Sequence, residues 1–195
     1  MKKLLVIIDM VNGFVNSGAL ADHKINKITP NIIKHIKMAI KNNIPIIAFK
    51  DSHNVNDEEF KVFPPHCIKG TSESELIPEL KQYEKHFTII EKNTTNGFNT
   101  KEFLTLAKKV TFDQVVVTGC CTDICVEQFV NAYSEFNKLN KRSTQIVIPV
   151  NAVYTFDGVN HNAVQCHKAA LNRMMQIGAK ITKGEDNEQS QIVKD

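Results

Sequence analysis

Short, continuous apolar runs recur along the 195-residue chain and restrict the folds open to it. The runs are rich in β-branched residues and lie at 4–9, 44–51, 87–92, 114–119, 144–150 and 179–182. A continuous apolar run of this length is typical of a strand that is buried on both faces. We therefore expect a mainly parallel sheet with helices on both sides.

Segments with helical periodicity separate these runs. Residues 26–43 repeat isoleucine at every fourth position from Ile28, and amphipathic patterns also mark 99–110, 122–139 and 160–178. Strands that alternate with helices predict an α/β fold, a three-layer α/β/α Rossmann-like sandwich with a six-stranded sheet. Ligands of such sheets bind beyond the carboxyl ends of the strands, near a switch in strand order. The residues that end each strand are therefore the first candidates for function.

The length of the chain fits one domain, which we place at residues 1–183. The polar tail at 184–195 is predicted to be disordered. Residues 52–86 form a long connection with only short helical patches, and long structured connections in compact domains are usually functional.

Charge and cysteine content exclude several classes of protein. The net charge of +3 comes from lysines spread along the chain, so we expect no nucleic-acid partner. No run approaches the roughly 20 apolar residues of a membrane span, and the apolar run at 4–8 is too short for a signal peptide. The five cysteines form no regular framework, which favours a reducing, cytoplasmic location. The sequence leaves monomer and homo-oligomer open.

Four predicted strand ends carry reactive side chains: Asp9, Asp51, Lys92 and the thiol cluster after Gly119, which includes Cys125. Each also has an ordinary structural interpretation, as a helix cap, a solvated lysine head and a small buried side chain. Cys125 falls in the first turn of the helix predicted from Thr122, where free N–H groups and the helix dipole favour a thiolate and can bind an oxyanion. Asp9 can serve as its base if the first and fourth strands are neighbours. We interpret Cys67, Cys120 and Cys166 as small apolar side chains.

A second group of residues has the pattern of a metal site. Asp51 and His53 are two positions apart, so on an extended segment they point the same way, and His66 can join them from the long connection. Two imidazoles and a carboxylate suit Zn²⁺, Fe²⁺ or Mn²⁺ and leave positions open for water or substrate. Glu59 or Glu58 is a candidate for a fourth contact.

The motifs around these residues resemble one family. "LLVIIDMVNGF", "FKDSH", "FPPHCIKGTSESELIPEL", "IIEKNTTNGF" and "VVVTGCCTDICV" resemble the nicotinamidase branch of the isochorismatase-like cysteine hydrolases, over residues 3–182. The resemblance implies the isochorismatase-like hydrolase fold. It implies catalytic roles for Asp9, Lys92 and Cys125, a metal held by Asp51, His53 and His66, and Glu59 at the place of an extra ligand in some relatives.

Further features rest on the resemblance alone. It implies a cis peptide bond between Cys120 and Cys121 and an oxyanion hole made by the backbone N–H groups of Cys121 and Cys125. Phe14 and Phe63 match the aromatic residues that sandwich a pyridine ring. The chain departs from the family at Val11, where glutamine is frequent, and at Phe63, where tryptophan is common.

The resemblance implies hydrolysis of nicotinamide to nicotinate and ammonia through a thioester, a reaction of NAD salvage. It implies one divalent metal ion, with zinc preferred over iron or manganese. Pyrazinamide is expected as a further substrate. The nearest alternative is an amidohydrolase of the same fold that acts on another small amide or carbamoyl group. A non-enzymatic metal or redox module built on Cys120 and Cys121 explains neither Asp9 nor Lys92. An NAD-binding Rossmann protein is disfavoured because no glycine-rich turn follows the first strand.

Overall fold

The structure is a computed structural model, and it describes residues 1–184. Its strands form one parallel sheet in the order β3-β2-β1-β4-β5-β7, and the short β6 pairs with β4. The strands are β1 (Lys3–Ile8), β2 (Ile46–Asp51), β3 (Phe87–Lys92), β4 (Gln114–Cys120), β5 (Gln145–Pro149), β6 (Val153–Tyr154) and β7 (Lys180–Thr182). The expected count of six strands is corrected to seven, because the two residues of β6 are too few to show a hydrophobic pattern.

Helices connect the strands in the order expected. They are α1 (Asn12–Val15), α2 (Thr29–Lys41), α3 (Pro78–Lys81), α4 (Lys101–Lys109), α5 (Glu127–Leu139) and α6 (Ala163–Gln176). Short turns complete the chain: η1 (His23–Ile28), η2 (Glu58–Lys61), η3 (Ser72–Ser74), η4 (Glu84–His86), η5 (Gly97–Asn99), η6 (Thr122–Val126) and η7 (Val150–Ala152). The long connection at 52–86 therefore contains only short helical pieces, as predicted.

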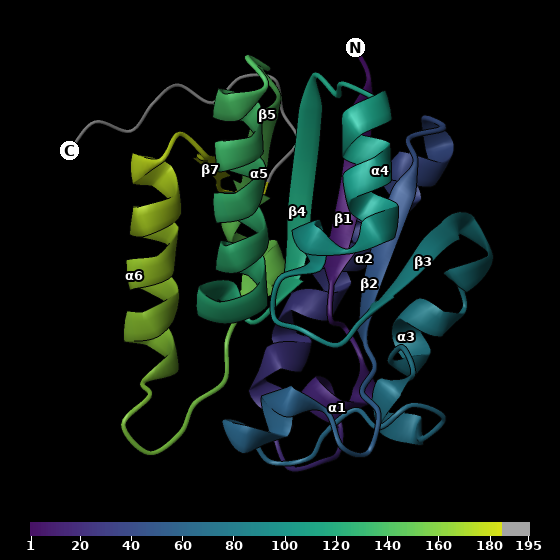
Figure 1. The fold of residues 1–195 in the computed structure, drawn as a ribbon, viewed down its shortest axis with the longest axis vertical. Coiled ribbons are helices and arrows are strands. Elements are labelled where there is room, and N and C mark those ends of the chain that lie inside the picture. Colours follow the sequence, from purple (N-terminus) through teal and green to yellow (C-terminus); the bar gives the residue numbers. More distant parts are fainter. Residues whose placement is uncertain (185–195) are drawn as a thin grey trace.

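The helices form a layer on each face of the sheet. α4, α5 and α6 cover one face, and α2 and α3 lie behind the other (Figure 1). The buried residues divide accordingly: Val6 of β1 packs with the residues of α4, α5 and α6, whereas Ile7 packs with Ile32 and Ile36 of α2. Successive residues of a strand point to opposite faces, so a strand buried on both faces reads as a continuous apolar run. The three-layer α/β/α fold is confirmed.

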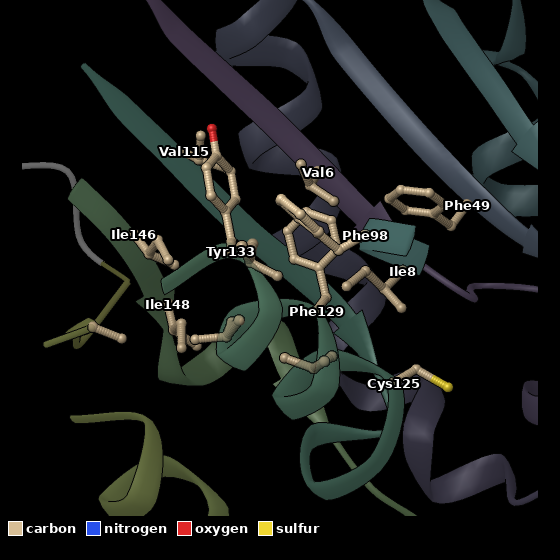
Figure 2. Close-up of a cluster of buried hydrophobic side chains, with 14 of the residues drawn as sticks. Val6, Ile8, Phe49, Phe98, Val115, Cys125, Phe129, Tyr133, Ile146 and Ile148 are labelled. Carbon is tan, nitrogen blue, oxygen red and sulfur yellow. The ribbon is translucent and has the colours of Figure 1, made fainter. Parts of the chain in front are cut away.

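An aromatic cluster fixes α5 against the sheet. The ring of Phe129 lies 5.6 Å from that of Phe49 and 5.8 Å from that of Phe98 between centroids, in tilted and edge-on arrangements that aromatic pairs favour. Tyr133 packs one turn further along the helix. Cys125 lies at the end of this cluster with its sulfur directed away from the rings (Figure 2). The core thus positions the turn that carries this thiol.

The strand order reverses between β1 and β4. The chain runs outward from β1 to β3, and then returns to β4 on the other side of β1. Ile8 pairs with Gly119 at the carboxyl ends of these two strands. Gly119 has φ +110°, and a Cβ there would lie 2.0 Å from the carbonyl oxygen of Ile8, so only glycine fits. This close approach brings the segments after β1 and β4 together at the switch point.

The predicted start of α4 and the predicted end of α6 are confirmed. Thr100 caps α4 by accepting from the backbone N–H of Phe103, and Gly178 follows α6 with φ +102°. In residues 1–184, no helix has the length and apolar character needed to cross a membrane. The predicted disorder of the tail falls on 185–195, which lie outside the described residues.

Candidate active site

A buried lysine joins two carboxylates and a thiol beyond the strand ends. The Nζ of Lys92 lies 2.8 Å from Asp9 Oδ2, 2.7 Å from Asp51 Oδ1 and 3.8 Å from the Sγ of Cys125. All four residues are buried. The structure therefore brings Asp9, Lys92 and Cys125 together.

Backbone geometry at the ends of β1 and β4 sets this arrangement. Asp9 leaves β1 with φ 52° and donates its N–H to the carbonyl of Phe49 on β2. Cys125 lies near the start of a helix that begins at Thr122, as predicted, but this first turn, η6, is π-helical and leads into α5. The carbonyl of Cys121 accepts from the backbone N–H groups of both Ile124 and Val126. The cis peptide bond expected between Cys120 and Cys121 is present.

Burial raises the pKa of two acidic groups of the cluster, Asp9 and Cys125. It raises the pKa of Asp9 to about 6, although Lys92 acts to lower it. It also raises the pKa of Cys125 well above that of a free thiol, more than Lys92 lowers it. Desolvation therefore opposes the thiolate that the start of a helix favours, and it outweighs the nearby cation. Burial acts against the charge of Lys92, but Asp9, Cys125 and Asp51 raise its pKa.

Asp51, His53 and His66 form the group expected for a metal. Their ligand atoms lie within 4.8 Å of one another, and all three residues are buried. The Nε2 atoms of His53 and His66 lie 2.9 and 3.1 Å from the same oxygen, Asp51 Oδ2. The other oxygen of Asp51 faces Lys92, so this carboxylate links the two halves of the site.

Neighbouring acceptors orient both imidazoles. Nδ1 of His53 lies 3.1 Å from Asp57 Oδ2, and Nδ1 of His66 lies 2.7 Å from the carbonyl oxygen of Pro64. An Nδ1–H donated to these acceptors leaves both Nε2 lone pairs for a cation, as in protein metal sites. Burial acts to raise the pKa of Asp51, yet Lys92 and the two histidines outweigh it and lower that pKa, so Asp51 is ionised. The donor set and its outer partners fit a divalent ion.

A narrow pocket opens onto both groups. Its walls are Phe14, Leu20, Asp51, Glu59, Phe63, His66, Thr95, Cys121, Ile124 and Cys125. Phe14 and Phe63 lie on this wall, with ring centroids 5.6 and 6.3 Å from that of His66. Glu59 also lines the pocket, where burial, reinforced by Asp51, raises its pKa. Glu58 instead points to solvent and pairs with Lys61.

Several residues of the site were not foreseen. Leu20, Thr95 and Ile124 supply pocket wall from the segment before η1, the segment after β3 and η6. Thr95 and Ile124 fall within quoted motifs, but their side chains carry no reactive group that would single them out. Asp57 lies within the acidic run "NDEE", and its spacing of four from His53 was the one available signal. Val11, at the position where the family often has glutamine, is buried against Cys67 and Leu76, so it packs the loop that carries His66.

The protein has a three-layer α/β fold with a buried thiol, carboxylate and lysine at the switch point. These features define it as a hydrolase of the isochorismatase-like class. The isochorismatase domain model matches residues 3–186. The chain belongs to the isochorismatase family.

Individual relatives point to amide hydrolysis. Nicotinamidase 1 of Arabidopsis thaliana is 35% identical over 92% of this chain and 82% of its own length. The nicotinamidase/pyrazinamidase PncA of Bacillus subtilis superposes with a TM-score of 0.77 at 28% identity, over 94% of this chain and 100% of its own. N-carbamoylsarcosine amidase of Thermoplasma acidophilum also has a TM-score of 0.77, at 27% identity, over 97% of this chain and 100% of its own.

Proposed function

We propose that the protein is a metal-dependent cysteine amidohydrolase that converts nicotinamide to nicotinate and ammonia, a reaction of NAD salvage. The observation that carries the proposal is the contact of Lys92 with both Asp9 and Cys125, beside the group formed by Asp51, His53 and His66. The relatives named as nicotinamidases support the choice of substrate. Pyrazinamide, which carries the same carboxamide on a similar ring, is expected as a second substrate.

Cys125 is the nucleophile and Asp9 its base in this proposal. The pKa of Asp9, about 6, leaves it ionised at neutral pH yet able to hold a proton during the reaction. Asp9 takes the proton of the Cys125 thiol as the sulfur attacks the carboxamide carbon. Asp9 then passes this proton to the amide nitrogen as the C–N bond breaks and ammonia leaves.

Water completes the cycle. Asp9 takes a proton from water as the water oxygen attacks the thioester, the C–S bond breaks to release nicotinate, and the proton returns to Cys125. The backbone N–H groups of Cys121 and Cys125 stabilise the oxyanion in both halves of the reaction. Lys92 keeps Asp9 in place and offsets the negative charge that the thiol gains.

Asp51, His53 and His66 would hold the divalent ion, and zinc suits a set of two imidazoles and one carboxylate. When bound, the ion supplies a Lewis acid for the ring nitrogen of the substrate. Phe14 and Phe63 offer apolar faces to the pyridine ring, and Glu59, on the same pocket wall, is the candidate for a further contact. The ring is thereby oriented with its carboxamide toward Cys125.

The N-carbamoylsarcosine amidase neighbour supports a second candidate, hydrolysis of a small carbamoyl compound on the same thiol. The test is ammonia release from nicotinamide, pyrazinamide and N-carbamoylsarcosine by zinc-loaded and chelator-treated protein, with nicotinate measured in parallel. We expect turnover of nicotinamide that depends on metal and is absent from Cys125→Ala. Turnover confined to the carbamoyl compound would replace the first candidate by the second, and turnover retained by Cys125→Ala would refute both.

A further inference from the structure

A second group of metal-ligand side chains lies apart from the first. The carboxylate of Asp123, the imidazole of His161 and the thiol of Cys166 have ligand atoms within 4.8 Å of one another. They come from η6, from the loop between β6 and α6, and from the first turn of α6. This group shares no residue with Asp51, His53 and His66, and the chemistry proposed above does not use it.

The ring of His161 is held in one orientation. It stacks on Phe156 with a centroid distance of 3.9 Å and an angle of 5° between the planes. Its Nδ1 lies 3.0 Å from the carbonyl oxygen of Phe156, which can only accept, so Nδ1 carries the hydrogen. Nε2 is thereby directed at Asp123 Oδ2, 2.7 Å away. Metal-ligating histidines are commonly oriented by such an Nδ1–H···O=C bond.

The carboxylate and the thiol complete a set of mixed donors. Asp123 Oδ1 is buried and, within residues 1–184, has no hydrogen-bond partner. Cys166 is a free, half-buried thiol. One oxygen, one nitrogen and one sulfur donor favour a borderline cation such as Zn²⁺ over Mg²⁺ or Ca²⁺, which prefer oxygen alone.

We propose that Asp123, His161 and Cys166 bind a second, zinc-class divalent cation. The ion would link Asp123, two residues before Cys125 in η6, to α6 and to the loop that carries His161. The competing explanation is an ion pair between Asp123 and protonated His161, with Cys166 as a bystander.

Cobalt(II) distinguishes the two explanations, because a thiolate ligand gives Co²⁺ a strong charge-transfer band in the near ultraviolet that oxygen and nitrogen ligands do not. The group of Asp51, His53 and His66 contains no sulfur, so its occupancy does not produce the band. The full chain is titrated with Co²⁺ alone, then with Zn²⁺, beside Cys166→Ser and the active-site control Cys125→Ser. Circular dichroism verifies that each variant is folded.

We expect the band in the wild type and in Cys125→Ser, its loss in Cys166→Ser, and its displacement by Zn²⁺. His161→Gln, which leaves the thiol in place, should weaken Co²⁺ binding at least tenfold, and it serves if Cys166→Ser does not fold. A wild type without the band overturns the proposal, as does a band that disappears in Cys125→Ser but persists in Cys166→Ser. A band that zinc fails to displace overturns the choice of cation. None of these readouts depends on nicotinamide turnover.

Discussion

Replacing Lys92 by methionine tests the electrostatics of the cluster. The ammonium lies 2.7 and 2.8 Å from two buried carboxylates, and Lys92 itself is 4% exposed. Methionine keeps much of the apolar stem but leaves Asp9 and Asp51 without their cation. Removing one partner of a buried ion pair costs about 3–5 kcal/mol. For a chain of this size, that cost lowers Tm by roughly 6–20 °C.

The cost should increase with pH. Without Lys92, the pKa of Asp9 rises above its wild-type value of about 6, because the cation that lowers it is gone. A carboxyl whose pKa is higher in the folded state loses stability as pH rises through that folded pKa. The destabilisation is therefore smaller at pH values where Asp9 can take up a proton, and larger where the folded protein must keep it ionised.

Urea unfolding of metal-free protein at mildly acidic and mildly alkaline pH measures this effect. Lys50→Met is the matched control, since Lys50 is 7% exposed on β2 but pairs at 3.4 Å with one carboxylate, the half-exposed Glu75. Such a solvated pair contributes about 0–1 kcal/mol. If Lys92→Met proves no less stable than Lys50→Met at both pH values, the ion-pair reasoning is refuted.

Three further predictions concern turnover and metal binding. Asp9→Asn should lower kcat/KM by roughly 10²–10⁴-fold in protein that circular dichroism verifies as folded, because a general base is lost while the side-chain shape is kept; full activity would contradict its role. The pH profile of kcat/KM should fall about tenfold per unit below a midpoint near the Asp9 pKa of about 6, since the ionised form is required; a flat profile down to pH 4.5 would contradict this. Asp57→Asn should weaken zinc binding roughly 10–100-fold in a chelator competition, because Asp57 orients His53. Glu58→Gln, one residue further and exposed, should bind zinc as the wild type does.

The fold was largely predictable because its sheet is buried on both faces. Continuous apolar runs such as 114–119 and isoleucines at every fourth position from Ile28 are direct consequences of that burial. The order of the strands was not contained in those patterns, since pairing of β1 with β4 depends on contacts far apart in the chain. β6 was missed because its two residues pair with β4 only through tertiary packing.

The site was predictable where function places a reactive group at a strand end. Asp9, Asp51 and Lys92 satisfy that rule, and the structure brings them together. The effect of burial on the pKa of Cys125 was not predictable, because the sequence shows a helix start but not how deeply the thiol is buried. Residues such as Leu20 line the pocket from loops, and the course of these loops could not be predicted from the sequence.

Mass spectrometry of protein quenched during turnover of nicotinamide tests the central claim most directly. The account predicts a covalent pyridinecarbonyl adduct on the peptide that contains Cys125, formed in the wild type, absent from Cys125→Ala and lost again once substrate is consumed. Ammonia release at the same rate without any adduct, or an adduct on another residue, would contradict the proposed role of this thiol.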